Sequence, residues 1–286
     1  MKLPGIQRRL GGACLIAIAL AGAMASAARS AELPKRIVSL NMCTDELVLR
    51  LADPAHIASV TWLSQDPRNA NMAEAARRIP ANHGLAEEVL GFRPDLVVAG
   101  AYTTRTTAGL LKRVGIAVRE FGVPRTIAET KTQITEMADL LGEPARGQAL
   151  AAEIEQRLQA LAARRVARPL RAIVLRPNGF TVGRGSLVDE ILTRAGLVNI
   201  AAELGAESYG QIPLETVVLG RAELLILNDT PDGPPSLAHE ILHHPVITEL
   251  GNRLRLVALP TRFWTCAGPG VVDAIELLVR AVEEQR

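Results

Sequence analysis

Short runs of aliphatic and β-branched residues alternate with helical patterns along most of the chain. This alternation predicts an α/β protein with parallel strands. Each half has only a few such runs, which suits two small sheets better than one large sheet. The predicted strands are residues 37–40, 57–60, 96–99 and 116–121 in the first half and 172–175, 224–227 and 254–259 in the second.

The clearest helical pattern lies between the two halves. Thr126 followed by Glu129 is a capping box that predicts a helix start, and Gly142 is a typical helix stop. Pro144 favours the start of a second helix, because proline suits the first helical position. Leucine and isoleucine then recur every three or four residues, which predicts one apolar face. We therefore expect two Rossmann-like βα lobes with mostly parallel sheets, joined by one long α-helix.

The first 31 residues have the pattern of a secretory signal peptide. Lys2, Arg8 and Arg9 precede an apolar stretch, and small residues follow it. The stretch is shorter than the ~20 residues of a membrane-spanning helix, although an uncleaved anchor is the alternative. We expect cleavage and export to an oxidising compartment, most simply a bacterial periplasm. The expected division is 1–31 for the signal peptide, 32–142 for the N-terminal lobe, 143–166 for the connecting helix and 167–286 for the C-terminal lobe.

The charge of the chain depends on whether the signal peptide is counted. The full chain has 32 basic and 30 acidic residues, a formal charge of +2. The first 31 residues contain four of the basic residues and no acidic residue, so the remainder has 28 basic and 30 acidic residues, a charge of −2. Nucleic-acid binding depends largely on neutralising phosphates with basic side chains. We therefore expect no nucleic-acid partner, and we expect a monomer.

Two segments that lie 128 residues apart repeat one pattern. In each, a glutamate is followed by an aliphatic pair, an arginine, an acidic residue and an aliphatic run. The repeat predicts that each glutamate opens a short helix, which leads through a turn into a buried strand. The matching residues are Glu87, Arg93 and Asp95 in the first half and Glu215, Arg221 and Glu223 in the second.

Four segments carry a resemblance to a known family. They are residues 36–41, 45–47, 85–98 and 212–215, which include Arg93-Pro94-Asp95-Leu96-Val97-Val98 and Ile212-Pro213-Leu214-Glu215. In this order, with a signal peptide and a long mid-chain helix, the chain resembles the periplasmic binding proteins of ABC importers for ferric siderophores, haem and vitamin B12. The resemblance implies a ligand cleft between two lobes and a protein that performs no chemistry.

The resemblance also implies two partners. One is a metal chelate, a ferric siderophore or cobalamin in preference to haem. The other is the ABC importer permease in the inner membrane, onto whose arginine residues one glutamate of each lobe docks. Glu87 and Glu215 fall at those positions. From the residues alone, each is also a solvated first-turn glutamate that the helix dipole favours.

The chain has only eight aromatic residues, and most of them follow predicted strands, where open α/β sheets bind ligands. Aromatic faces suit a flat conjugated chelate, and arginine pairs with its carboxylates. Ordinary packing is the alternative for each aromatic residue, and solvation is the alternative for each arginine. The candidate ligand-binding residues are Trp62, Tyr102, Phe180, Tyr209, Phe263 and Trp264, with Arg184 and Arg262, and with Arg105 as a further cation.

Cys43 and Cys266 are the two cysteines beyond the signal peptide. Alignment with the family would place them on opposite walls of the cleft. They could form a disulfide, which requires Cα atoms within ~7 Å, or contact the ligand metal as thiols. They could also be two unrelated small buried residues. We favour the last interpretation, and we keep both residues as candidate ligand contacts.

His239, Glu240 and His243 form an HExxH motif. In zincins the two histidines bind zinc from one helix face and the glutamate acts as a base. A secreted zinc hydrolase is therefore the alternative function. Flanking prolines leave a short helix, no histidine beyond residue 244 supplies a third ligand, and Glu249 or Asp273 would have to serve. We therefore expect no enzyme, no resident metal and no cofactor.

Overall fold

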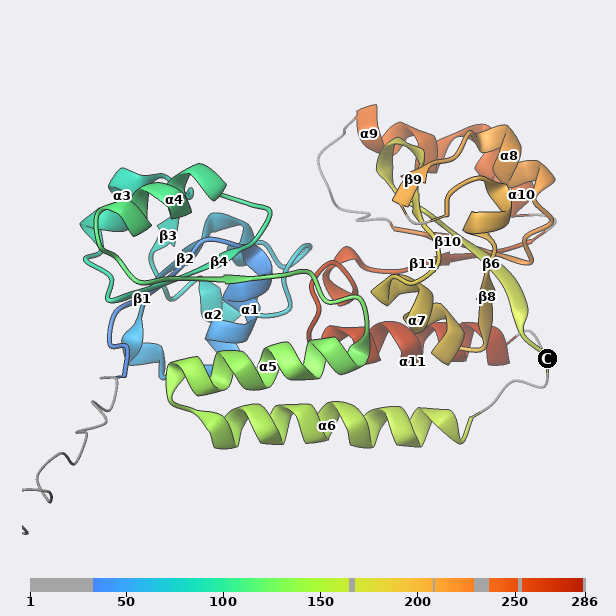
Figure 1. Ribbon diagram of the computed structural model, residues 1–286. Coiled ribbons are helices and arrows are strands. Elements are labelled where there is room, and N and C mark those ends of the chain that lie inside the picture. The colour runs from blue at the N-terminus through green and yellow to red at the C-terminus, as the bar shows by residue number, and fades with distance from the viewer. Residues whose placement is uncertain (1–32, 165–167, 208, 229–236, 252–253, 285–286) are drawn as a thin grey trace, which may run out of the picture. The chain divides into compact units, whose positions relative to one another are not determined.

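The computed structural model describes residues 33–284, apart from 165–167, 208, 229–236 and 252–253. The predicted signal peptide lies outside the described residues. The described chain forms one five-stranded and one four-stranded parallel sheet (Figure 1). This confirms the predicted fold class of two βα lobes joined by a long helix. Within the same residues, no helix has the length and apolar character needed to cross a membrane.

The five-stranded sheet of the N-terminal lobe has the order β3-β2-β1-β4-β5, with all neighbours parallel. The chain leaves the central strand β1 first to one side and then to the other. The carboxyl ends of β1 and β4 therefore form a switch point, where open α/β sheets bind ligands. The elements are β1 (Ile37–Ser39), α1 (Met42–Leu51), β2 (Ile57–Thr61), α2 (Ala73–Ala76), β3 (Ala81–Asn82), α3 (Ala86–Gly91), β4 (Leu96–Gly100), α4 (Arg105–Arg113) and β5 (Val118–Phe121), with the 3-10 turns η1 (Pro54–His56) and η2 (Trp62–Gln65).

The four-stranded sheet of the C-terminal lobe has the order β11-β10-β6-β8, again parallel. A separate antiparallel pair is formed by β7, which lies between β6 and β8 in the chain, and β9, which lies between β8 and β10. The strands are β6 (Leu170–Leu175), β7 (Phe180–Val182), β8 (Leu197–Asn199), β9 (Tyr209–Gln211), β10 (Leu224–Leu227) and β11 (Arg255–Ala258). The helices are α7 (Leu187–Arg194), α8 (Leu214–Leu219), α9 (Leu237–Glu240), α10 (Pro245–Leu250) and α11 (Gly270–Glu283), with the 3-10 turns η3 (Pro177–Gly179), η4 (Ala201–Leu204), η5 (Ile241–His243) and η6 (Thr261–Phe263).

Two long helices, α5 (Ile127–Leu141) and α6 (Pro144–Ala162), follow the first sheet. The predicted helix start is confirmed, because Thr126 Oγ1 accepts a hydrogen bond from Glu129 N at 3.0 Å. The Glu129 carboxylate accepts its hydrogen bond from Arg125 N, at 2.7 Å, one residue before the position that a capping box uses. Gly142 ends α5 with a φ of 76°, a left-handed conformation that glycine adopts readily. The two helices pack side by side (Figure 1), and a Cβ at Gly147 would lie 2.4 Å from Ala138 Cβ. Close packing of α5 on α6 therefore requires glycine at position 147.

A continuous hydrophobic core runs from one lobe into the other through these helices. It contains Val48 of α1, Ile154 of α6, Leu192 of α7 and Ile275 of α11, all of them buried. Arg157 of α6 adds an ion pair to Asp273 of α11 at 2.6 Å. The lobes are therefore joined by shared packing as well as by the chain.

Candidate ligand-binding site

A cavity of about 450 Å³ lies where strand ends of the two lobes come together. The N-terminal lobe contributes the segments that follow β1, β4 and β5, which include Tyr102 and Arg125. The C-terminal lobe contributes Arg176 directly after β6, Arg184 after β7, and Trp264 before α11. Parallel strands present their carboxyl ends at one edge of a sheet, so the doubly wound order explains why these segments converge.

Asn41 organises the N-terminal wall of this cavity. Its side-chain oxygen caps α1 by accepting hydrogen bonds from Cys43 N at 2.9 Å and Thr44 N at 3.4 Å. Its Nδ2 atom donates to Thr103 Oγ1, in the segment after β4, at 3.1 Å. An N-cap asparagine satisfies the free N–H groups of a helix start. Here the same side chain also fixes the position of the neighbouring wall segment.

A disulfide joins Cys43 to Cys266, with 4.9 Å between their Cα atoms. The interpretation as two unrelated buried residues is therefore wrong. The bridge links the first turn of α1, which follows the central strand β1, to the segment before α11, which follows β11 at the edge of the second sheet. Cys43 lines the cavity and Cys266 is buried, but with both sulfur atoms in the bridge neither is a free thiol.

A second polar contact joins the lobes close to the disulfide. Asn71 Nδ2 donates to the backbone oxygen of Arg262 at 2.8 Å and to the carboxylate of Glu46 at 3.3 Å. Glu46 is buried, and burial raises the pKa of its carboxyl, while the ion pair with Arg50 opposes that shift. The floor of the interlobe region is therefore held by covalent and hydrogen bonds.

Trp264 is fixed at the cavity wall by a hydrogen bond and by a cation. Its Nε1 atom donates to Asn228 Oδ1 at 2.8 Å, and the indole is only 3% exposed. The guanidinium carbon of Arg176 lies 5.3 Å from the centre of the ring, a cation–π distance. One face of the indole ring is therefore in contact with the guanidinium of Arg176.

The structure brings together part of the predicted site. Phe180 does not line the cavity but stacks on Tyr209, which does, with 5.3 Å between ring centres. The cavity is lined by the predicted residues Cys43, Tyr102, Arg184, Tyr209 and Trp264.

Other predicted residues lie elsewhere. Trp62 does not line the cavity, because it follows β2, which lies on the far side of β1 from β4. It is 52% exposed and stacks on His83. The guanidinium of Arg262 lies 4.8 Å from the ring centre of Phe263, and neither residue lines the cavity. Arg105 begins α4 and is also outside the lining.

Of the three arginines that line the cavity, sequence reasoning missed Arg125 and Arg176. Arg176 directly follows the predicted strand of the second lobe, so the strand-end rule that selected the aromatic residues also applies to it. Arg125 lies between β5 and α5, one residue before the cap of α5, and its Nε atom donates to the backbone oxygen of Gly185 at 3.1 Å. Position after a strand was therefore a usable signal for Arg176 and a weaker one for Arg125.

The HExxH segment does not form the helix that a zincin needs. The α-helix α9 ends at Glu240, and residues 241–243 form a 3-10 turn, so His239 and His243 are not on one continuous α-helix face. Asp273, a possible third ligand, accepts a hydrogen bond from Arg157 at 2.6 Å. Across the described ranges, no cluster of three or more His, Cys, Asp or Glu side chains could hold a metal ion.

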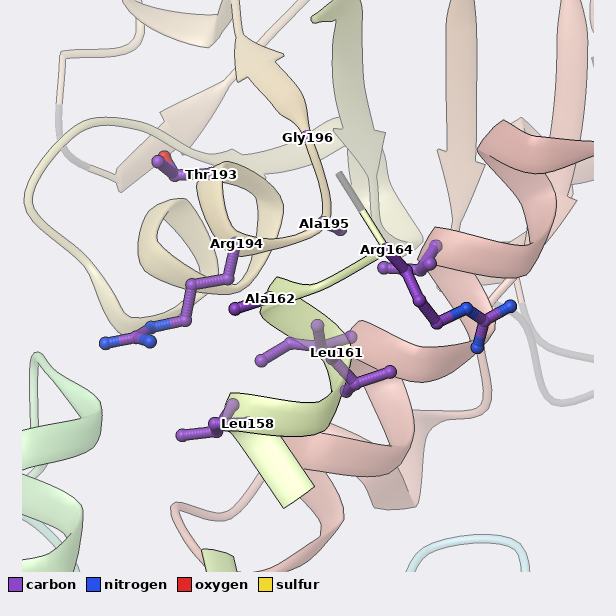
Figure 2. A pocket seen from close by; sticks show the side chains of 10 residues that line it. Leu158, Leu161, Ala162, Arg164, Thr193, Arg194, Ala195 and Gly196 are labelled. Carbon is purple, nitrogen blue, oxygen red and sulfur yellow. The ribbon is translucent and has the colours of Figure 1, made fainter. Parts of the chain in front are cut away.

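A second cavity, of about 370 Å³, lies among α6, α7 and α11 (Figure 2). Aliphatic side chains such as Leu158 and Leu161 line it. Arg164 and Arg194 at its edge are paired with Glu283 and Glu190. None of the predicted site residues belongs to it.

The two candidate docking glutamates occupy equivalent places. Glu87 lies in the first turn of α3 and Glu215 in the first turn of α8, and both are exposed. The arginines six residues later, Arg93 and Arg221, both have positive φ, at 49° and 53°. The repeat predicted from the sequence therefore extends to the backbone conformation.

Known proteins share this architecture. A family model described as "Periplasmic binding protein" matches residues 37–249. The cobalamin-binding protein of Halobacterium salinarum is 25% identical over 259 residues, which cover 87% of this chain and 69% of that protein. The periplasmic heme-binding protein RhuT from Roseiflexus sp. RS-1 has a TM-score of 0.71 at 23% identity, covering 87% of this chain and 99% of that one. The vitamin B12 binding protein BtuF of Vibrio cholerae has a TM-score of 0.68 at 21% identity, covering 88% and 97%.

Two parallel-stranded lobes, a long connecting helix and a cavity at the strand ends define a two-lobed ligand-binding protein. The chain belongs to the periplasmic binding protein family, as the match over most of its length shows. This confirms the predicted family. Its relatives are binding proteins rather than enzymes.

Proposed function

We propose that this protein captures a metal chelate in the periplasm and delivers it to the permease of an ABC importer. The observation that supports this most strongly is the cavity of about 450 Å³ at the carboxyl ends of both sheets. Its size lies in the range of small-molecule sites, and it combines aromatic with cationic side chains. The names of the relatives, which bind cobalamin or heme, point to the same ligand class.

Tryptophan fluorescence titration tests this function directly. Trp264 lines the cavity, so a bound chelate is expected to quench its emission. The three probes are cyanocobalamin, a ferric siderophore and haemin. Binding of at least one with a Kd below ~10 μM, which corresponds to about −7 kcal/mol, is expected. Failure of all three at that concentration would contradict the proposal.

Delivery would use the exposed Glu87 and Glu215. Both are placed in first helical turns, and neither has an ion pair or a side-chain hydrogen bond within the described chain. A free carboxylate on each lobe is available to an arginine of a partner protein. The permease is therefore the proposed partner of these two residues.

The proposed mature protein begins after a cleaved signal peptide at 1–31 and has lobes at 32–142 and 167–286, joined by the helix at 143–166. Mass spectrometry of the protein secreted to the periplasm would give its N-terminal residue. An intact Met1 in that sample would contradict cleavage and would favour the uncleaved anchor. Size-exclusion chromatography with light scattering would test the predicted monomer.

A further inference from the structure

The cavity carries positive charge without a compensating acid. Three arginines line it, and no aspartate or glutamate is among the residues that line it. Arg125 and Arg184 are exposed and Arg176 is half-buried. Within the described part of the chain, none of the three has an ion pair. Other arginines of this protein, such as Arg157 and Arg164, are paired with carboxylates.

Arg176 is the least solvated of the three. Its Nε atom is buried and has no hydrogen-bond partner in the described chain. Burial also lowers the pKa of this guanidinium, and the interaction with Tyr209 opposes that shift only in part. Buried charged groups are ordinarily paired, because desolvation without a partner is costly. The N–H groups of the Arg176 guanidinium are therefore suited to donate hydrogen bonds to an acceptor on the ligand.

The orientation of Arg176 is fixed before any ligand binds. Its guanidinium lies over the Trp264 ring, 5.3 Å from the centre, and the ring is held by Asn228. Asn228 Oδ1 also accepts a hydrogen bond from Thr261 at 3.2 Å. A donor that is held in place loses little conformational entropy on binding. Trp264 and Asn228 are thus positioning residues for the cation.

We propose that Arg176 selects for negatively charged chelates by pairing with an anionic oxygen of the ligand, with Arg125 and Arg184 as further cations of the same cavity. The anionic oxygen could be a carboxylate or an ionised catecholate, since both accept paired hydrogen bonds from a guanidinium. This inference rests on the proposed function and orders its candidate ligands by charge. Cobalamin, whose phosphate charge is balanced within the molecule, is expected to bind more weakly than an anionic chelate.

Calorimetric titration of the mature protein tests the order of affinities. The probes are ferric enterobactin, which presents catecholates, haemin, which presents carboxylates, and cyanocobalamin. At least one anionic probe should bind at least about tenfold more tightly than cyanocobalamin. Cyanocobalamin binding as tightly as both anionic probes would overturn the inference and leave the proposed function standing. Failure of all three probes to bind below ~10 μM would overturn both.

Variants test the residue itself. Arg176→Met should weaken the anionic probe about 10- to 100-fold, and Arg176→Lys should fall between this variant and the wild type. Arg262→Met is the matched control, because Arg262 also lies over an aromatic ring but outside the cavity. The affinity of this variant for the anionic probe should stay within about twofold of the wild-type affinity. A folded Arg176→Met variant with wild-type affinity would overturn the assignment.

The salt dependence of wild-type binding gives a readout that does not depend on a variant folding. Raising sodium chloride from about 50 mM to about 500 mM should weaken the anionic probe severalfold, because screening reduces its attraction to the arginines. The same change should leave cyanocobalamin nearly unaffected. An equal response of both probes would contradict selection by charge.

Discussion

The two lobes share a backbone design and differ in the chemistry that they bring to the cavity. In the N-terminal lobe, Arg36 Nε donates to the backbone oxygen of Arg93 at 3.2 Å, and Arg36 N donates to Asp95 Oδ1 at 3.0 Å. These contacts tie the start of β1 to the turn that leads from α3 into β4. The left-handed residue at this turn is therefore supported by a side chain from the neighbouring strand.

The C-terminal lobe repeats these contacts with different residues. Arg171 Nε donates to the backbone oxygen of Arg221 at 3.3 Å, and Arg171 N donates to Glu223 Oε2 at 3.0 Å. The turn now leads from α8 into β10. The repeat thus also includes an arginine near the start of the first strand of each lobe, Arg36 and Arg171.

The cavity does not follow this repeat. The C-terminal lobe contributes Arg176, Arg184, Tyr209 and Trp264, whereas the principal cation from the first half of the chain is Arg125. The shared contacts therefore preserve the scaffold and the equivalent placement of Glu87 and Glu215. The cavity lining, in contrast, differs between the lobes in its aromatic and cationic side chains.

The lobes differ also in buried charge. Asp45 in the first turn of α1 is fully buried, whereas Asp189 in the first turn of α7 is half-buried and accepts a hydrogen bond from Gly185 N at 3.0 Å. Asp45 accepts hydrogen bonds from Thr61 and Ser64, but its Oδ1 atom has no partner among the described residues. The first turn of α1 therefore contains a desolvated carboxyl, whereas the first turn of α7 contains a partly hydrated one.

The largest expected effect comes from removing the disulfide that links the two lobes. Replacing Cys43 and Cys266 together by serine should lower the free energy of unfolding by about 2–4 kcal/mol, because the bridge restricts the unfolded chain. Urea denaturation followed by fluorescence measures this. Dithiothreitol should destabilise the wild type to a similar degree and leave the double variant unchanged. Equal midpoints for the wild type and the variant would show that the bridge contributes nothing to the coupling of the lobes.

The buried carboxyl of the N-terminal lobe should produce a pH effect of similar or smaller size. Burial raises the pKa of Asp45 to about 6 from its ordinary value of 3.8. The folded state then holds this proton more tightly than the unfolded chain does. The contribution of Asp45 to the free energy of unfolding therefore falls as pH rises from about 4 to about 6, by at most about 3 kcal/mol.

Asp45→Asn should remove this fall, while the matched variant Asp189→Asn in the other lobe should retain it. Urea titrations at about pH 4.5 and about pH 7 give the difference between the two pH values for each protein. If Asp45→Asn kept the wild-type difference, the carboxyl of Asp45 would not be the source of the asymmetry between the lobes.

A smaller effect tests the part of the backbone that the lobes share. Arg93 and Arg221 adopt left-handed φ values, which cost about 1–2 kcal/mol for a residue with a Cβ. Glycine avoids that cost but increases the entropy of the unfolded chain. Arg93→Gly and Arg221→Gly should each raise the free energy of unfolding by about 0.5–1 kcal/mol. Thermal unfolding should show a change in stability of the same sign for both variants. A stabilised variant at one position and a destabilised variant at the other would contradict the equivalence of the two turns.

The sequence predicted the elements whose pattern is continuous and buried. Residues 224–227 were predicted as a strand and form β10, and Thr126 and Gly142 bound the predicted helix α5. Four strands were missed because each has only two or three residues, with no alternation long enough to recognise; they are β3, β7, β8 and β9. Short strands depend on pairing with a distant partner, which one sequence does not display.

The site was less predictable because its geometry depends on strand order. Trp62 follows a strand just as Tyr102 does, yet only Tyr102 lines the cavity, since β4 lies at the switch point and β2 does not. Arg176 also follows a strand, but its contact with Trp264, which is distant in the sequence, could not be predicted. The disulfide likewise required two chain segments to be placed together. The chemical type of each residue and its position after a strand could be predicted from the sequence. The meeting of distant segments at one cavity could not.

The smallest expected effect on the isolated protein comes from the two glutamates that we propose for docking. Glu87 and Glu215 are exposed, and within the described chain neither has an ion pair or side-chain hydrogen bond to lose. Their interaction with the helix start contributes about 0.3–0.5 kcal/mol at an exposed site. Glu87→Ala and Glu215→Ala, singly or together, should therefore leave folding almost unchanged, and ligand affinity too, since neither residue lines the cavity.

The same substitutions should slow uptake through the importer, most strongly in the double variant. Surface charges steer and align a partner, so the lobes should contribute comparably, and high salt should reproduce part of the defect. Glu153→Ala, on the exposed face of α6, is the control and should transport normally. Uptake of radiolabelled chelate in proteoliposomes containing the permease measures this. A normal rate for the double variant would leave both residues as solvated helix-start glutamates, and the repeat would then serve the fold alone.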